Sequence, residues 1–228
     1  MQHLIKQEQF EIEILDRLNS WKLLRPLIFC GGTMLRLCHG LNRYSVDLDF
    51  WLATKIDARR LFNVLKDALR HEYTLTDATN KRRTILFEVK SHRYPRRLKI
   101  EIRKESKKLG IERAIAYSRY SNTQVILSTA SLKEMMDSKI EAFLSRKEIR
   151  DVFDIEFLFK KGIALPNDPN RLQAVLSTSE KLSRNDYTVK LSSLLDADQR
   201  QYYLSENFKI IKRAIAGQIG ASGHDSPR

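Results

Sequence analysis

Two aspartates separated by one residue form the pair most suggestive of chemistry in this sequence. Asp47 and Asp49 alternate with Val46, Leu48 and Phe50, and strict alternation indicates a strand buried on one face, so both carboxylates point the same way. At a rise of roughly 3.3 Å per residue, their Cα atoms lie about 6 to 7 Å apart, close enough to share two divalent ions. Without metal the two carboxylates repel, so one binds a proton more readily. An isolated Asp-x-Asp is also common on the solvated face of an edge strand.

A glycine turn precedes the aspartates and adds an anion site. The apolar run 26–30 ends at Gly31 and Gly32, and the next residues have the apolar spacing of a short helix. Thr33 is expected at the N-cap, where the free N–H groups and the helix dipole attract a negative charge. The turn is not a P-loop, because no Gly-Lys-Ser/Thr follows, and it lacks the third glycine of a dinucleotide fingerprint.

Together these pieces resemble the start of nucleotidyltransferase domains of the DNA polymerase beta type. Within that superfamily the sequence resembles AbiEii/AbiGii-type toxins, including the mycobacterial MenT group, whose pattern is G-G-T/S-x-L followed by R-x-S-x-D-h-D-h. The matching segments are 31–35, 43–45 and 46–50. The resemblance implies that the turn holds the phosphates of an NTP beside two bound metals. It implies nucleotide-binding roles for Gly31, Gly32, Thr33, Arg43 and Ser45.

The resemblance also implies a third carboxylate on a later strand. In the alternating segment 96–103, Glu101 falls on the face opposite the apolar residues, together with three cations. We expect Glu101 to be the third metal ligand. Glu88, in the expected strand 84–90, is the rival candidate, and a plain solvated position is the alternative for Glu101.

A helix over 131–151 is expected to carry cations toward a site. Ser131 and Glu134 form a capping box, and apolar residues recur at helical spacing. At about 100° per residue, Lys139, Arg146 and Arg150 lie within about 20° of one another on the apolar side, so they face protein or a cleft. The alternative for a lysine on such a face is a snorkelling surface residue.

The resemblance gives these residues roles. Residues 139–142 match a K-h-x-A motif whose lysine neutralises the triphosphate, and residues 150–154 match R-D-x-x-D. Lys139 is therefore expected to be catalytic, with Arg146 and Arg150 binding the nucleotide. Asp154 is expected to orient Lys139 or to act as a base. The alternative is an Arg/Asp network, including Asp151, that joins two helices.

Charge indicates a polyanionic partner. The 228 residues include 41 Lys and Arg against 28 Asp and Glu, a net charge of +13 with a pI near 9.8. Segments 90–99 and 112–120 mix basic with aromatic residues, which suit phosphates and exposed bases. Each segment alone is more often a solvated face, but together they favour RNA.

Other features of the composition bound the class of protein. With 42% hydrophobic residues, the chain can form one mixed domain or two small ones. It has no apolar run of about 20 residues and no charged-then-apolar leader, so we expect a cytoplasmic protein without membrane insertion. Cys30 and Cys38 form neither a disulfide framework nor a zinc pattern.

The expected fold is α+β, or mixed α/β. Residues 1–130 are expected to form a polymerase-beta-like core with a mixed sheet, residues 131–218 a helical domain completing the active-site cleft, and residues 219–228 a flexible tail. The helices expected in the core span 4–24 and 57–70, with a short one after the glycine turn. Its strands are expected at 26–30, 46–52, 72–78, 84–90, 97–103 and 123–127.

The sequence therefore predicts a Mg²⁺-dependent nucleotidyltransferase that moves a nucleoside monophosphate from an NTP to RNA, expected to be the tRNA 3′ end, and releases pyrophosphate. Two Mg²⁺ ions are expected at Asp47, Asp49 and Glu101. The resemblance implies the toxin of a toxin–antitoxin or abortive-infection system, with a cognate antitoxin. The alternatives are an inactive RNA- or partner-binding module, or transfer to a protein or small molecule.

Overall fold

The computed structural model describes residues 1–53, 56–104 and 110–222, and it divides the chain into two compact units. The first unit is Met1–Ser131 and the second is Leu132–Arg228. Within the described residues, no helix is both long and apolar enough to cross a membrane.

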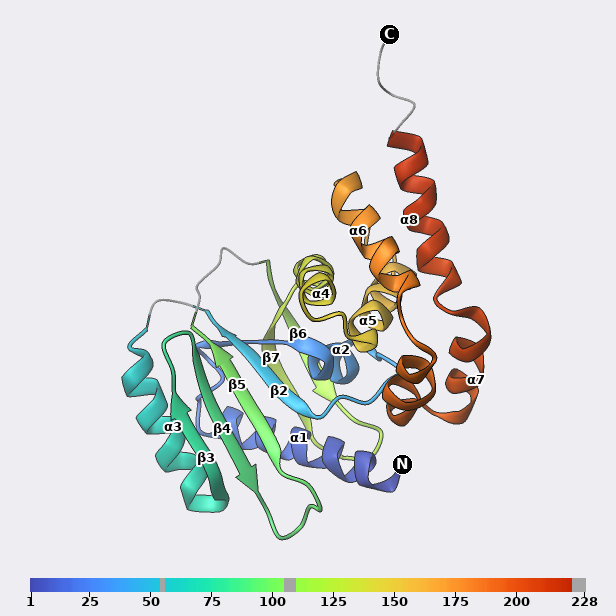
Figure 1. Ribbon diagram of the computed structural model, residues 1–228. Helices are drawn as coiled ribbons and strands as arrows, with labels where there is room; N and C mark the ends of the chain where they lie inside the picture. The colour runs from blue at the N-terminus through green and yellow to red at the C-terminus, as the bar shows by residue number, and fades with distance from the viewer. Residues whose placement is uncertain (54–55, 105–109, 223–228) are drawn as a thin grey trace. The chain divides into compact units, whose positions relative to one another are not determined.

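The first unit contains a mixed sheet, which confirms the predicted fold class. In the described residues the sheet has seven strands in the order β3-β4-β5-β2-β1-β7-β6 (Figure 1). The β2–β5 and β1–β7 pairs are parallel and the others are antiparallel. The strands are β1 Leu27–Cys30, β2 Asp47–Leu52, β3 Thr74–Asn80, β4 Thr84–Lys90, β5 Leu98–Arg103, β6 Ile111–Tyr117 and β7 Gln124–Ala130.

The buried face of the sheet comes from apolar residues that are opposite one another in neighbouring strands. Leu48 of β2 pairs with Ile100 of β5, which pairs with Phe87 of β4, and all three are buried. Phe62 stacks on Phe87 at 5.3 Å between ring centroids, which packs a helix onto this face. The helices of this unit are α1 Gln2–Ser20, α2 Gly31–His39 and α3 Ala58–Glu72.

One strand of this sheet is not among the predicted ones. β6 lies at the sheet edge and reverses the usual pattern, because Ile111, Ile115 and Tyr117 are on its exposed face. The other predicted strands match within a few residues, and α1 ends at Ser20 rather than near residue 24. The segment lacks clean apolar alternation, because Arg113 shares a face with Ile111 and Ile115, while the opposite face has only alanines besides Glu112.

The second unit is helical, as predicted, but the expected helix over 131–151 is wrong. α4 ends at Arg146 and α5 begins at Ile149. Between them Lys147 has a left-handed φ of 56°, and its N–H donates to the Phe143 carbonyl at 2.8 Å. Arg150 is therefore on a different helix from Lys139, and the expected alignment of three cations on one helix does not exist.

The remaining elements of this unit run almost to the end of the chain. α8 continues to Ser222, so residues 219–222 are helical rather than part of a loose tail; residues 223–228 lie outside the described residues. The elements are α4 Leu132–Arg146, α5 Ile149–Lys160, α6 Pro169–Glu180, a π-helical turn Asp186–Leu191, a 3₁₀ turn Ser192–Leu194, α7 Ala197–Glu206 and α8 Lys209–Ser222.

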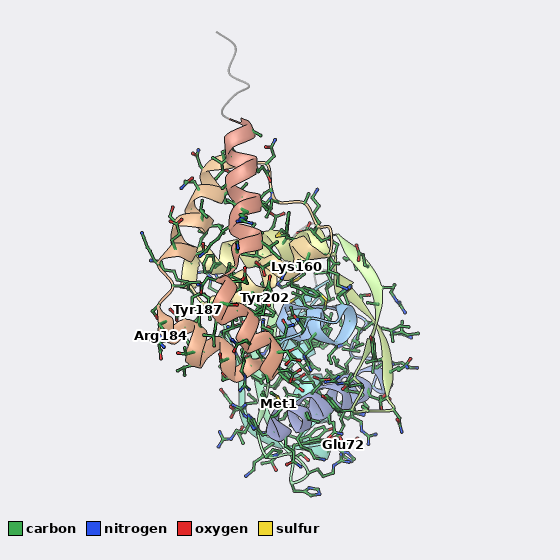
Figure 2. The ribbon with its side chains drawn as sticks, turned by 90° about the vertical axis from the view of Figure 1, so that its right-hand side faces the viewer. Met1, Glu72, Lys160, Arg184, Tyr187 and Tyr202 are labelled. Carbon is green, nitrogen blue, oxygen red and sulfur yellow. The ribbon has the colours of Figure 1, made fainter. Side chains whose placement is uncertain are left out.

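A buried carboxylate ties three helices of this unit together. Glu156 of α5 accepts hydrogen bonds from Lys160 at 2.8 Å, from the Tyr203 hydroxyl at 3.0 Å and from the Ile211 N–H at 3.2 Å. Lys160 also lies over the ring of Tyr202 at 5.1 Å (Figure 2). Burial and the nearby Glu156 charge raise the pKa of Tyr203 above its ordinary value. Glu156 therefore joins α5 to α7 and α8.

Candidate active site

The turn between β1 and α2 is packed directly against polar side chains. Gly31 opens α2 with φ +81°, and a Cβ atom there would lie 2.5 Å from Oδ2 of Asp49. A Cβ atom on Gly32 would lie 2.6 Å from Nη2 of Arg43 and 2.8 Å from Oγ of Ser45. A Cβ atom at Gly31 would displace Asp49, and the left-handed φ there also favours glycine, whereas a Cβ atom at Gly32 would displace the ends of the Arg43 and Ser45 side chains.

Thr33 does not cap the helix, contrary to expectation. The N-cap residue of α2 is Cys30, and Thr33 is fully buried in the first turn. Its hydroxyl donates to the carbonyl oxygen of Asp47 at 2.5 Å. Thr33 therefore joins the start of α2 to the start of β2. The first N–H groups of a helix have no partner within it, so this end of α2 can still bind an anion.

The paired aspartates lie on one face of β2, as the alternation predicted. Asp47 and Asp49 are half-buried, whereas Leu48 and Phe50 are buried on the other face. In the strand register Asp49 is opposite Cys30 of β1 and Glu101 of β5. This register places Glu101 next to Asp49 on the same sheet face, although the two residues are 52 positions apart in sequence.

The rival carboxylate is farther from the aspartates. Glu88 is opposite Lys99 of β5, and Lys99 in turn is opposite Asp47, so one strand separates Glu88 from the pair. Its carboxylate accepts hydrogen bonds from Thr76 at 2.6 Å and Arg97 at 2.9 Å, and these lower its pKa. The geometry therefore favours Glu101 over Glu88 as the third carboxylate. The role of Glu101 as a metal ligand stays a prediction.

A lysine lies within this acidic group. The Lys99 ammonium is 2.7 Å from Oε2 of Glu101, and Arg103 is 3.9 Å from the other oxygen. Burial alone lowers the pKa of Lys99, but the hydrogen bond to Glu101 and the nearby carboxylate charges outweigh it and raise the pKa. Across the described residues, no three acidic, His or Cys side chains converge into a ready-made metal site.

Arg43 is a predicted nucleotide ligand that the structure buries. Its residue exposure is 2%, its Nη1 donates to the carbonyl of Tyr44 at 3.0 Å, and its guanidinium is the nearest group to Gly32. In this structure Arg43 supports the loop before β2. Its role toward a nucleotide stays a prediction, and Ser45, half-buried beside Gly32, is better placed for one.

Sequence reasoning missed a buried polar group beneath the site. Glu8 of α1 accepts from Arg36 of α2 and from Ser118 Oγ at 2.5 Å, and Arg36 lies 3.7 Å from the centre of the Tyr44 ring. Glu11 is fully buried, and neither of its carboxylate oxygens has a hydrogen-bond partner. Burial, followed by the Glu8 charge, raises its pKa well above the ordinary value. The sequence does contain a signal for this group, because Glu8 and Glu11 are three residues apart among the apolar positions of the opening helix.

Two of the three cations predicted in the helical unit, Lys139 and Arg146, form a network with two buried aspartates. The Lys139 ammonium is 2.7 Å from Asp154 and 3.6 Å from Asp151, and both aspartates are fully buried. Arg146 donates to both oxygens of Asp151, each at 2.6 Å. Asp154 is thus in position to orient Lys139, a role that stays a prediction, and the same network joins α4 to α5. Arg150 is half-buried on α5, and its Nε has no partner.

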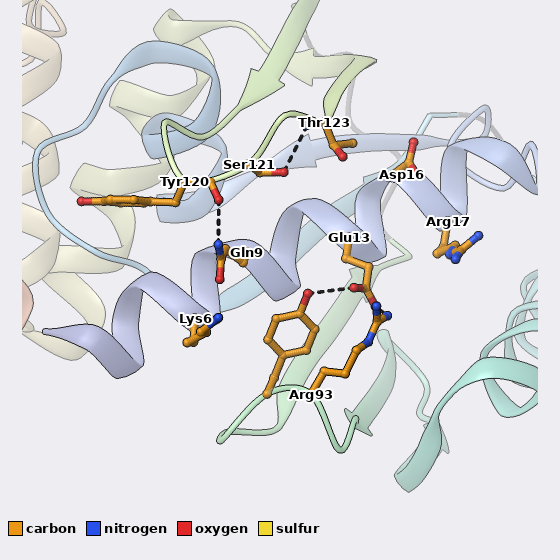
Figure 3. Close-up of a pocket in the computed structure, with 10 residues that line it drawn as sticks. Lys6, Gln9, Glu13, Asp16, Arg17, Arg93, Tyr120, Ser121 and Thr123 are labelled. Atoms are coloured by element: carbon orange, nitrogen blue, oxygen red, sulfur yellow. Dashed lines mark hydrogen bonds and ion pairs between the residues drawn. The ribbon is translucent and has the colours of Figure 1, made fainter.

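A separate hollow of about 400 Å³ lies beside α1 (Figure 3). Arg93 and Tyr94 line it from one of the two basic and aromatic segments, and Tyr120 comes from the other. Glu13 of α1 anchors this wall, accepting from Arg93 at 2.6 Å and from Tyr94 at 2.7 Å. The structure therefore brings the two segments together. The hollow contains none of the predicted catalytic residues.

A strand, a Gly-Gly turn and a helix, followed by a strand with paired aspartates in a mixed sheet, form the arrangement expected of a nucleotidyltransferase of the polymerase beta type. The family described as nucleotidyl transferase AbiEii toxin, type IV TA system, matches residues 13–213, and the chain belongs to this family. The match confirms the predicted family, the nucleotidyltransferase activity and the toxin–antitoxin class. The comparison with curated proteins found no match.

Solved structures support the fold. JHP933 from Helicobacter pylori is 22% identical with a TM-score of 0.55, and the match covers 94% of this chain and 96% of that one. A putative nucleotidyltransferase from H. pylori is 21% identical, with a TM-score of 0.54 and 91% and 96% coverage. MenT4, a nucleotidyltransferase toxin from Mycobacterium tuberculosis H37Rv, is 13% identical, with a TM-score of 0.55 and 94% and 91% coverage. At these identities the likeness concerns the fold.

Proposed function

We propose that this enzyme transfers a nucleoside monophosphate from an NTP to the 3′ end of tRNA. The observation that carries the proposal is the contact between the glycine turn and the acid pair, where Gly31 leaves no room for a Cβ atom beside Asp49. Phosphates bound by the N–H groups at the start of α2 would therefore lie next to the carboxylates. The acceptor oxygen forms a bond to the α-phosphorus, the bond from that phosphorus to the oxygen bridging the α and β phosphates breaks, pyrophosphate leaves, and the hydroxyl proton passes to solvent.

The carboxylates fit the hard cation that this chemistry uses. Asp47, Asp49 and Glu101 supply oxygen ligands from adjacent strand positions, and oxygen is what Mg²⁺ prefers. Mg²⁺ held by these residues would neutralise the triphosphate and activate the attacking hydroxyl. Thr33 holds the first residue of β2 in place through the Asp47 carbonyl.

The remaining predicted residues are proposed to bind the nucleotide. Lys139, oriented by Asp154, would neutralise charge on the leaving pyrophosphate, an electrostatic contribution to transfer. Asp154 is fully buried and paired with Lys139, which supports an orienting role over that of a base. The nucleotide-binding set proposed for test is Gly31, Gly32, Thr33, Arg43, Ser45, Lys139, Arg146 and Arg150.

The RNA acceptor and the biological partners follow from charge and family. A net charge of +13 suits a polyanion, and the two basic and aromatic segments meet at the hollow beside α1. Membership of a type IV toxin–antitoxin family implies a cognate antitoxin. We place the reaction in the cytoplasm, where tRNA and NTPs are found together.

The test is incubation of the purified protein with total tRNA, Mg²⁺ and each α-³²P-labelled NTP in turn. Label should appear on tRNA with at least one NTP and should disappear in Asp47→Asn. Glu101→Gln should also lose the label, whereas Glu88→Gln, its matched control, should keep it. Tight, salt-sensitive tRNA binding without label would contradict RNA transfer and favour another acceptor.

A further inference from the structure

Lys99 lies beside the carboxylates that are proposed to bind metal, where its own positive charge would oppose a bound metal ion. It is directly opposite Asp47 in the β2–β5 register and two residues before Glu101 on the same strand face. Its ammonium lies 2.7 Å from Oε2 of Glu101. The candidate third ligand is therefore already bound to a positive charge.

Electrostatics explain why the ammonium lies there. Asp47, Asp49 and Glu101 lie on one sheet face, and their charges repel one another when no cation neutralises them. Lys99 is the cation in hydrogen-bond contact with Glu101, whereas Arg103 is 3.9 Å away with a side chain that is 59% exposed. A divalent ion at the same carboxylates would repel the Lys99 ammonium.

We propose that Lys99 is an internal counter-ion that competes with divalent metal for Glu101 and thereby sets the metal affinity of the site. In the metal-free protein Lys99 neutralises the carboxylates, and metal loading requires its ammonium to leave Glu101. This inference rests on the proposed metal site. Lys99 is a positioning residue in this account, because it acts through Glu101.

Direct binding of Mn²⁺ to the full chain, measured by electron paramagnetic resonance without NTP or RNA, tests the inference. Lys99→Met should bind Mn²⁺ more tightly, on the order of tenfold, because one positive charge a few ångströms away is removed. Lys99→Arg keeps the charge and should stay near the wild type. Arg103→Met, the matched control on the same strand, should change the affinity much less.

Thermal unfolding gives a second readout that does not depend on activity. Metal-free Lys99→Met should unfold at a lower temperature than the wild type, because Glu101 loses the ammonium that lies 2.7 Å away, and Mn²⁺ should raise its midpoint by more. Lys99→Gln keeps a hydrogen-bonding group without the charge and should behave as Lys99→Met does, which separates charge from side-chain packing.

The outcomes distinguish this inference from the proposed function. If Asp49→Asn binds Mn²⁺ as the wild type does, the proposed metal site itself is wrong. If Asp49→Asn loses Mn²⁺ while Lys99→Met binds no more tightly than the wild type, the counter-ion role is overturned. Unchanged Mn²⁺ affinity with weaker NTP binding in Lys99→Met would instead make Lys99 a phosphate ligand.

Discussion

Gly31 shows how one residue couples the backbone to the chemistry. Its φ of +81° is left-handed, and its missing side chain leaves the space that Asp49 fills. Gly40 has a similar φ of +77°, but no atom lies within 4 Å of the position that its Cβ would take. Comparing alanine substitutions at the two glycines therefore distinguishes the effect of backbone strain from the effect of displacing the Asp49 carboxylate.

We predict that Gly31→Ala lowers transfer by at least about 100-fold, because moving a metal-binding group by about 1 Å costs that much. Both Gly31→Ala and the control Gly40→Ala should lose about 1–2 kcal/mol of stability from the left-handed conformation. The measurements are NTP transfer to tRNA and urea unfolding. Normal transfer by Gly31→Ala would show that the contact with Asp49 is not needed.

The raised pKa of Glu11 leads us to predict that the stability of the protein depends on pH. This pKa is raised well above the ordinary value near 4.5, so the native state keeps a proton that the unfolded chain releases. Stability must therefore fall as the pH rises from about 4.5 toward the raised pKa, because the native state binds more protons over that range.

Glu11→Gln removes this titration, so the variant should gain stability relative to the wild type as the pH rises above about 4.5 and show no such gain at lower pH. The measurement is the urea unfolding midpoint against pH, with EDTA present to exclude metal effects at Asp47. Glu112→Gln, an exposed glutamate on β6, is the control. Parallel pH profiles for the wild type and Glu11→Gln would refute the prediction.

Between elements, Glu156 makes the most connections in the helical unit. Its carboxylate accepts from Lys160, Tyr203 and the Ile211 N–H while fully buried. A glutamine there has one acceptor oxygen and would turn its amide nitrogen toward a donor. We predict that Glu156→Gln destabilises the chain by about 2–4 kcal/mol, as expected for a broken buried network.

Chemical unfolding followed by circular dichroism measures this loss, with Glu141→Gln on the exposed side of α4 as the control. The control should change stability by less than about 0.5 kcal/mol. An equally small change in Glu156→Gln would mean that solvent or a neighbouring group replaces the lost acceptor.

The strands that position the site could be predicted because their residues alternate in the expected sense. β2 and β5 have apolar residues on the buried face and acids on the other, so the alternation predicted that Asp47, Asp49 and Glu101 lie opposite the apolar face, while their roles as metal ligands stay a prediction. Their adjacency depends on a register between segments about 50 residues apart, which local patterns do not encode. For the same reason the Lys99–Glu101 contact was not predicted.

The end of α4 shows a different limit. Lys147 and Glu148 are good helix formers, so local propensity predicts one continuous helix. The chain instead turns at Lys147, and the buried aspartates of α5 then bind Arg146 and Lys139 of α4. Tertiary ion pairs outweigh propensity here, and they require positions that are known only after folding.

At the scale of the whole molecule, the family match covers residues of both compact units, whereas the basic and aromatic segments lie in one of them. The family match spans residues 13–213 and so includes residues of both compact units. The basic and aromatic segments both belong to the first unit and meet at the hollow beside α1. Lys99, the last residue of the first segment, is opposite Asp47 in the strand register, so this segment also reaches the paired aspartates.

We predict that tRNA binding depends steeply on salt and that Lys6 and Arg93, which line the hollow, contribute to that dependence. Each lost phosphate contact should reduce the slope of log affinity against log salt by about one, so Lys6→Gln/Arg93→Gln should lower it by about two. Arg59→Gln/Arg60→Gln removes the same charge from exposed positions at the start of α3 and should change the slope less. Fluorescence anisotropy with labelled tRNA at several salt concentrations measures both. Equal slopes for the two double variants would mean that the net charge, rather than this surface, attracts RNA.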